Sequence, residues 1–370
     1  MRRGDKLQIA IDCRMIGMSG IGVYLKNIVP EVIRQAPQFR FILIGPSSGL
    51  SSLYLPADAD VIFRSCKAPI YSICEQILIP LVSRDADLLW IPHYNIPIFT
   101  KIPLVTTIHD VAHLVLNEVI KNAVRLYYAK YMFDAVRYKS KEIICVSRFT
   151  ANEFMCRVGV PKGGLHVIYN GVDDAWLDEG KKNKKEVIPP YFIAVGNLKQ
   201  HKRIDMLCRV FSSIKETIPH HLILIGKHKG FITGGQSIQE LIDLAPDRIV
   251  SIDSIDTPDL REMVHNATAL VFPSSYEGFG LPPLEALATG VPVIAADIPP
   301  VREVCGNHAA YFKLDDERDL AEKLIDMAQK GKRYDPTILQ DHATRFSWER
   351  AGCDTIEVLK KALKNYTIMR

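Results

Sequence analysis

A repeated alternation of short apolar runs with longer helical segments is the feature that most constrains the fold. Runs rich in Val and Ile lie at residues 7–12, 39–45, 61–63, 88–91, 104–108 and 143–146. Strands of a buried parallel sheet are near-continuous apolar runs, and neighbouring parallel strands need a crossover that is usually helical. The pattern therefore predicts an α/β domain built of βαβ units.

The alternation is interrupted once and then resumes, which predicts a second domain. Residues 180–186 are polar and precede Pro189-Pro190, a composition typical of a solvated linker. Further strand-like runs lie at residues 191–195, 221–225, 249–252, 269–272 and 293–295. A chain of 370 residues is long enough for two cores. We expect domains over residues 1–175 and 190–345, with a helix of about residues 346–370, capped by Ser347, packing back on the first domain.

Composition narrows the class of protein. The formal net charge of +4 gives no reason to expect a nucleic-acid partner. The eight cysteines form no C-x-x-C pair, so we expect reduced core residues and a cytoplasmic location. No apolar stretch approaches the roughly 20 residues that cross a bilayer, so any membrane contact is expected to be peripheral, on the inner face.

The segment 272–292 carries the most chemical information. Gly278 and Gly280 let the backbone approach a ligand, and a proline at 282 or 283 suits the first turn of a helix whose free amides favour a diphosphate. Glu277 and Glu285 place two carboxylates at different depths, which suits two hydroxyl-rich groups. The alternative, a turn with two surface glutamates, leaves the glycines and the helix start unexplained.

This segment resembles the E-x7-E signature of retaining glycosyltransferases of the GT-B fold, in glycosyltransferase family 4. The resemblance spans the entire chain, and its further motifs are Gly20-Ile21-Gly22-Val23-Tyr24, Thr107-Ile108-His109-Asp110, Val146-Ser147-Arg148-Phe149-Thr150, Ile168-Tyr169-Asn170-Gly171-Val172-Asp173, and Val195-Gly196-Asn197-Leu198 through His201-Lys202. It implies two Rossmann-like, doubly wound domains facing a central cleft, with the acceptor in the first and the nucleotide sugar in the second. Ligands of such sheets bind beyond the carboxyl ends of the strands.

The resemblance also implies roles for the residues of the second half. Glu277 would contact the transferred hexose and stabilise its developing positive charge, and Glu285 would hold the ribose hydroxyls. Lys202 matches the family lysine that neutralises the diphosphate; a solvated lysine at a helix start is the alternative. The loop residues assigned to the donor are Gly278, Phe279, Gly280 and Leu281.

A lysine and a helix start beside the diphosphate supply charge stabilisation that a metal would otherwise give, so we expect neither metal nor cofactor. Asn197 stands where the family often has arginine, and Arg203 or Lys199 could compensate for the missing charge. Two D-x-D triplets, 58–60 and 85–87, precede their strands, where acids are common, and are not expected to bind metal.

In the first half, Gly20 and Gly22 belong to a G-x-x-G-x-G loop that lacks the spacing of a dinucleotide fingerprint. The resemblance places this loop beside the phosphates and the acceptor; a tight turn is the alternative. His109 ends a strand, and the resemblance makes it a contact near the reacting centre. A buried structural histidine is the alternative, and we do not assign it as the general base.

A basic segment, residues 118–141, has two interpretations. Its cations and interleaved tyrosines could dock on anionic lipid head groups. A helical stripe could instead face the core, with the cations as a solvated rim. That stripe consists of Ile120, Val124, Tyr127, Tyr131 and Ala135.

The resemblance thus implies a metal-independent, retaining hexosyltransferase. The segments 195–197 and 92–97 are similar to mannosyltransferase-like members that build bacterial polysaccharides or lipopolysaccharide. GDP-mannose is therefore the favoured donor, with UDP-sugars next, and a glycan or polyprenyl-linked hydroxyl is the acceptor. The alternatives are a noncatalytic nucleotide-sugar-binding subunit and a GT-B epimerase or phosphorylase.

Overall fold

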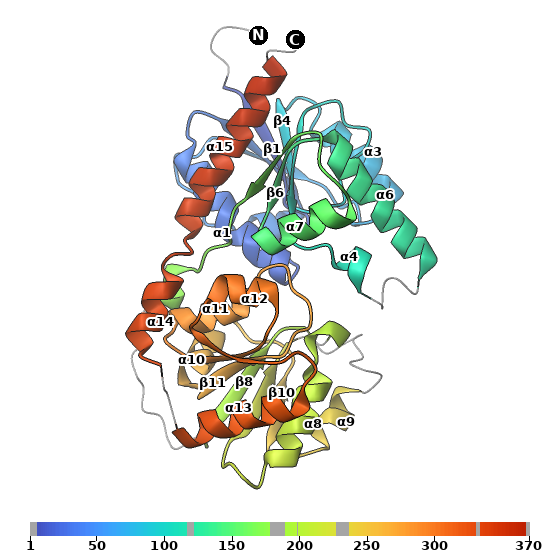
Figure 1. Ribbon diagram of the computed structural model, residues 1–370. Coiled ribbons are helices and arrows are strands. Elements are labelled where there is room, and N and C mark those ends of the chain that lie inside the picture. The colour runs from blue at the N-terminus through green and yellow to red at the C-terminus, as the bar shows by residue number, and fades with distance from the viewer. Residues whose placement is uncertain are drawn as a thin grey trace. The chain divides into compact units, whose positions relative to one another are not determined.

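The computed structural model describes residues 6–116, 122–177, 189–197, 199–226, 237–330 and 334–367. It divides into two compact units (Figure 1). Unit 1 comprises Met1–Gly171 together with Phe346–Arg370, and unit 2 comprises Val172–Arg345. The polar segment 180–186, expected to be a linker, lies outside the described residues.

Unit 1 is built on a parallel sheet, in which seven strands are described in the order β3-β2-β1-β4-β5-β6-β7. The strands are β1 (Gln8–Asp12), β2 (Arg40–Gly45), β3 (Val61–Ser65), β4 (Leu88–Ile91), β5 (Leu104–Ile108), β6 (Ser140–Cys145) and β7 (Gly164–Val167). The order reverses between β1 and β4, which is the switch point at which doubly wound sheets bind ligands.

Helices cover this sheet, and one of them comes from the far end of the sequence. They are α1 (Gly20–Gln35), α2 (Ser47–Leu50), α3 (Ile73–Val82), α4 (Ala112–Val115), α6 (Ala123–Lys139), α7 (Arg148–Arg157) and α15 (Trp348–Thr367). Helix α15 packs along α1 and over β4, β5 and β6. The Arg350 amide donates to the Ser347 hydroxyl (3.3 Å), which confirms Ser347 as a helix cap.

Unit 2 repeats the design with a parallel sheet whose described strands run β10-β9-β8-β11-β12-β13. The strands are β8 (Tyr191–Val195), β9 (His221–Ile225), β10 (Ile249–Ile252), β11 (Ala269–Phe272), β12 (Val293–Ala296) and β13 (Ala309–Phe312). The helices are η1 (Asp174–Trp176), η2 (Gln200–Lys202), α8 (Ile204–Ile214), α9 (Ile238–Ile242), α10 (Thr257–Asn266), α11 (Leu281–Ala288), α12 (Pro299–Cys305), α13 (Glu317–Lys330) and α14 (Pro336–Ala343). Its switch point lies between β8 and β11.

The predicted fold class, α/β with two Rossmann-like parallel sheets, is confirmed. Helix α8, which follows β8, buries an apolar stripe on which Leu207, Cys208 and Phe211 are fully enclosed. Strands β7 and β13 were not predicted, and each lies at an edge of its sheet.

Two expectations about burial are wrong. One interpretation of residues 118–141 placed an apolar stripe of α6 against the core of the domain. This stripe instead points to solvent, because Val124, Tyr127 and Tyr131 are 79%, 72% and 58% exposed. The helix instead buries a different face against the unit, and Ile120 lies outside the described residues. The buried residues of α6 are Ala129, Met132, Phe133 and Val136. Likewise, all eight cysteines are free, but Cys74, Cys156 and Cys353 are exposed.

Candidate functional site

The loop between β11 and α11 forms the centre of the candidate site in unit 2. Gly280 has φ +114°, in the region that favours glycine, and it precedes the first turn of α11. No side chain caps this helix start, and prolines 282 and 283 lack amide hydrogens. The donors that α11 offers to a ligand are therefore concentrated in the amides of Gly280 and Leu281.

A second segment of unit 2 is fastened to this loop. The Ser275 amide donates to the His201 carbonyl (2.7 Å), and the Ser275 hydroxyl donates to the same oxygen (3.1 Å). His201 belongs to η2, so these bonds hold η2 against the loop.

The next residue of η2, Lys202, forms an ion pair with Glu277. Both side chains are largely buried, and the Lys202 ammonium lies 5.4 Å from the centre of the Phe272 ring. The structure thus brings together the predicted lysine and the predicted acid, 75 residues apart in sequence.

Glu285 lies on the same helix as the loop's amides. Burial raises the pKa of its carboxyl from 4.5 to about 7, and the charge of Asp173 adds to the effect. Among the described residues, no group forms a hydrogen bond or ion pair with this carboxylate. A half-buried carboxylate of this kind is suited to accept hydrogen bonds from ligand hydroxyls.

Two glycines shape the turn that follows β8. A side chain at Gly226 would place its Cβ 2.0 Å from the Gly196 carbonyl oxygen, so the two backbones touch. Around Gly196 itself the space is open, since the nearest atom to an added Cβ is Lys202 Cε at 3.9 Å. Sequence reasoning missed Gly226 and Ser275 as supports of the site, because both act on segments distant in sequence.

The other two predicted donor residues of unit 2 lie on the same turn. Asn197 is half-buried and its carbonyl accepts from the Lys199 amide (2.8 Å). Arg203 adopts a left-handed backbone (φ +54°) and pairs with Asp315. Its guanidinium is therefore engaged with α13's preceding loop rather than with Glu277.

In unit 1, His109 follows β5 within a group of aromatic rings. Its ring lies edge-on to Tyr24, with centroids 4.8 Å apart, and Nε2 donates to the Pro92 carbonyl (3.0 Å). Burial lowers its pKa to about 4. A histidine that is neutral at pH 7 with so low a pKa is a poor general base but can still contact a ligand.

The two predicted glycines of unit 1 differ in their surroundings. Gly22 is packed in the first turn of α1, where an added Cβ would lie 2.6 Å from the Ile16 carbonyl oxygen. Nothing lies within 4 Å of a Cβ added at Gly20. Packing therefore explains a glycine at 22 but not at 20.

Three of the four acids of the two D-x-D triplets are engaged with protein groups, and the fourth, Asp58, is exposed. Asp60 pairs with Arg40 (2.8 Å), Asp85 pairs with Arg64 (2.5 Å), and Asp87 accepts from the Gln8 amide (2.8 Å). Within the part of the chain that the structure describes, no three His, Cys, Asp or Glu side chains gather closely enough to hold a metal ion.

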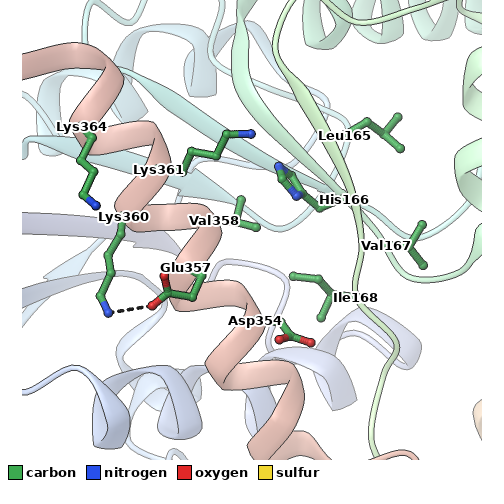
Figure 2. A pocket seen from close by; sticks show the side chains of 10 residues that line it. All are labelled: Leu165, His166, Val167, Ile168, Asp354, Glu357, Val358, Lys360, Lys361 and Lys364. Carbon is green, nitrogen blue, oxygen red and sulfur yellow. Dashed lines mark hydrogen bonds and ion pairs between the residues drawn. The ribbon is translucent and has the colours of Figure 1, made fainter. Parts of the chain in front are cut away.

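A pocket of unit 1 lies between β7 and α15, and Figure 2 shows its lining residues. Beneath it, the buried carboxylate of Glu142 pairs with His166 (2.7 Å) and Lys361 (3.1 Å). None of the predicted site residues lines this pocket.

The comparisons with known proteins agree with this architecture. The family model described as Glycosyltransferase Family 4 matches residues 19–176, and that described as Glycosyl transferases group 1 matches residues 178–338. The chain is a family 4 glycosyltransferase of the GT-B fold.

Curated relatives of this glycosyltransferase include two mannosyltransferases. The O-antigen chain mannosyltransferase RfbU of Salmonella typhimurium is 27% identical over 250 residues, covering 67% of each chain. The O-antigen chain mannosyltransferase B of Escherichia coli is 23% identical over 69% of this chain and 70% of its own.

Among solved structures, Anabaena HepE in complex with UDP-glucose matches with a TM-score of 0.74 at 16% identity, over 96% of this glycosyltransferase and 100% of HepE. At this identity the likeness establishes the fold. None of the helices in the described ranges is long and apolar enough to cross a membrane.

Proposed function

We propose that this glycosyltransferase transfers a hexose from a nucleotide diphosphate sugar to an acceptor hydroxyl, with retention of the anomeric configuration and without a metal. The observation that carries the proposal is the gathering of Lys202, Glu277, Glu285 and the uncapped start of α11 in unit 2. This set offers positive charge, hydrogen-bond donors and two carboxylates to one ligand.

The positive groups suit the diphosphate. Lys202 forms an ion pair with Glu277, so an incoming diphosphate would share or take over the lysine's charge. The amides of Gly280 and Leu281 add fixed donors, and Asn197 offers a neutral amide on the neighbouring turn. Arg203 would add a second charge only after leaving Asp315.

The two acids suit the hydroxyl-bearing ends of the donor. Glu285, a carboxylate without a described partner, would accept from the ribose hydroxyls. Glu277 would face the hexose, where its charge stabilises the oxocarbenium character that develops as the bond breaks.

The proposed reaction breaks the bond between the anomeric carbon and the diphosphate oxygen and forms a bond to the acceptor oxygen on the same face. The acceptor proton passes to the departing phosphate oxygen, so no protein nucleophile is required. His109, whose pKa is about 4, acts in this scheme as a contact in unit 1 rather than as the proton acceptor.

Mannose from GDP-mannose is the donor we favour, because the two curated relatives described above are mannosyltransferases. A UDP-sugar is second, since the solved HepE structure holds UDP-glucose. The same relatives act on O-antigen chains, which supports a glycan acceptor, free or carried on a polyprenyl lipid.

The test is a donor panel with GDP-mannose and UDP-sugars, in which released nucleoside diphosphate and transferred sugar are both measured. Lys202→Ala is expected to weaken donor binding and slow turnover by about 10²-fold or more. The matched control is Lys215→Ala, at the end of α8, which should leave both unchanged. Tight nucleotide binding with no transfer on any acceptor would favour a noncatalytic subunit.

Retention of the anomeric configuration and independence from metal are each tested by a separate measurement. Proton NMR of the product should show an α linkage from an α-linked donor, and excess EDTA should leave the rate unchanged. Inversion, or loss of activity that is restored by a divalent cation, would contradict those parts of the proposal while leaving glycosyl transfer intact.

A further inference from the structure

Helix α3 of unit 1 presents an apolar face to solvent. Its exposed large side chains include Ile73, Ile77 and Leu81, which are 83%, 63% and 52% exposed. These residues are spaced four apart and so form one stripe. Cys74 and Leu78 are the other exposed positions of the helix, so no exposed position on α3 is charged or strongly polar.

The polar side chains of α3 point inward instead. Glu75 is buried, pairs with Arg14 (2.9 Å) and accepts from the Asn95 side-chain amide. The Gln76 side chain donates to the Ile96 carbonyl (3.1 Å) and accepts from the Ile98 amide (2.8 Å). The helix thus reverses the usual arrangement of a surface helix, in which the apolar face is the buried one.

Helix α6 adds aromatic and cationic groups to the same side of unit 1. Besides Val124, Tyr127 and Tyr131, Tyr138 is also exposed, at 51%. Arg125 and Lys130 are exposed cations of this helix, and Asp134 is an exposed acid. Tyrosine is suited to a membrane interface, because its ring is apolar and its hydroxyl is polar.

The two helices are joined through the loop 92–99. The Tyr128 hydroxyl donates to the Asn95 side-chain oxygen (2.5 Å), and Asn95 in turn binds Glu75 of α3. Lys139, at the end of α6, donates to the Ile98 carbonyl, next to Phe99, which is 72% exposed. Figure 1 shows α3 and α6 on one side of unit 1. We call Ile73, Ile77, Leu81, Phe99, Val124, Tyr127 and Tyr131 the α3–α6 face.

We propose that the α3–α6 face docks on a lipid bilayer that contains anionic head groups. Ten residues of helix extend about 15 Å, which is too short to cross a bilayer, so α3 would lie in the membrane plane with its stripe among the upper acyl carbons. Exposed cations near the ends of α3 and just after the loop 92–99, Lys67, Arg84 and Lys101, would meet the head groups. The exposed acid beside Arg84, Asp85, is paired with Arg64.

Charge favours a membrane over a second copy of this chain. In a symmetric dimer the same patch meets itself, so the cations at its rim would face one another. An anionic bilayer matches both the apolar stripe and the basic rim. The inference does not depend on the proposed donor chemistry, which rests on residues of unit 2.

The test is co-sedimentation of the full chain with vesicles of phosphatidylcholine alone and of an equimolar mixture with phosphatidylglycerol. Binding to the mixed vesicles is expected, weakening as salt rises. Ile77→Glu with Leu81→Glu should weaken it about tenfold or more. The matched control places glutamates at two exposed apolar positions of unit 2, Val250 and Ile338, which are 47% and 53% exposed, and should leave vesicle binding unchanged.

A second measurement reports the environment of α3 directly. In a Cys156→Ser, Cys353→Ser background, Cys74 is the remaining exposed cysteine and can carry a polarity-sensitive dye. Its emission should shift to the blue on mixed vesicles. Native thermal unfolding of all these variants, followed by circular dichroism, would show that unit 1 still folds. Nucleoside diphosphate binding, measured by calorimetry, should also be unchanged, which separates this test from that of the donor site in unit 2.

Two results would overturn the proposal. One is equal binding of the native chain and the Ile77, Leu81 variant to mixed vesicles. The other is absence of binding to mixed vesicles. A dimer in light scattering that the same variant dissociates would then make the face a contact between two copies.

Discussion

The surroundings of the Glu285 carboxyl are those of a group that binds a ligand. The fold holds it half-buried, so its pKa of about 7 is well above the ordinary 4.5. Proteins tolerate such a group where a ligand will satisfy it. The linear E-x7-E pattern was enough to predict that Glu277 and Glu285 flank one loop, but not that one is paired with Lys202 while the other lacks a described partner.

The raised pKa of Glu285 makes stability depend on pH. Because folding disfavours ionisation, the carboxyl's contribution is fully present below about pH 4.5 and is lost as pH rises through 7. Glu285→Gln should therefore be more stable than the native chain at pH 8, by roughly 1–3 kcal/mol, and nearly equal at pH 4.5. Urea midpoints at the two pH values measure this. Glu216→Gln, at an exposed position, should show no such dependence.

Alanine substitutions at Gly20 and Gly22 distinguish a role in packing from a role in ligand binding. Gly22→Ala should cost roughly 1–3 kcal/mol, because its Cβ would press on the Ile16 carbonyl. Gly20→Ala should leave the melting temperature unchanged, since the space around it is open. If the loop meets the donor phosphates or the acceptor, Gly20→Ala should nevertheless raise KM or lower kcat. Native kinetics in this variant would leave Gly20 as a turn residue only.

At the scale of elements, the sequence revealed the central strands of each sheet and also two edge strands, β3 and β10, whose apolar runs are recognisable although Phe63 and Val250 are 54% and 47% exposed. The two that escaped, β7 and β13, are short edge strands, and every residue of β7 is only half-buried. An edge strand is covered less completely, so its sequence needs no continuous apolar run.

The prediction of which face of α6 is buried was wrong for a related reason. Spacing identifies a stripe but not whether protein covers it, and the smaller residues Ala129 and Val136 proved to face the unit. The contacts that assemble the donor site, such as that of Ser275 with His201, join elements that are far apart in the sequence. The residue spacing within one element therefore cannot predict them.

Helix α15 should stabilise unit 1 through its first turn. Trp348 is buried and its ring lies 5.8 Å from that of Tyr24, which in turn contacts His109. Trp348→Ala should lower the free energy of unfolding by about 3–5 kcal/mol. Calorimetric titration with nucleoside diphosphate should still give the native affinity, because the donor residues belong to unit 2. A large loss of nucleotide affinity would show that α15 acts beyond its own unit.

At the scale of the whole molecule, all donor residues of the proposal lie in one uninterrupted segment, Val172–Arg345. This segment has its own sheet and core, so it should fold when produced alone and bind nucleoside diphosphate within about tenfold of the native affinity. It should transfer no sugar, since His109 and the Gly20 loop are missing. An unfolded segment, or one without nucleotide affinity, would show that the site depends on unit 1.

The discontinuity of unit 1 has a consequence for synthesis. Gly171 and Trp348 adjoin so closely that a Cβ on the glycine would lie 2.1 Å from the Trp348 nitrogen, so the polypeptide leaves unit 1 and re-enters it at a single spot. During translation, the described strands of the unit 1 sheet are therefore synthesised early, whereas helix α15, which packs over β4, β5 and β6, is synthesised last. Unit 1 begins to be translated first, but it can complete its fold only after the whole of unit 2 has been synthesised.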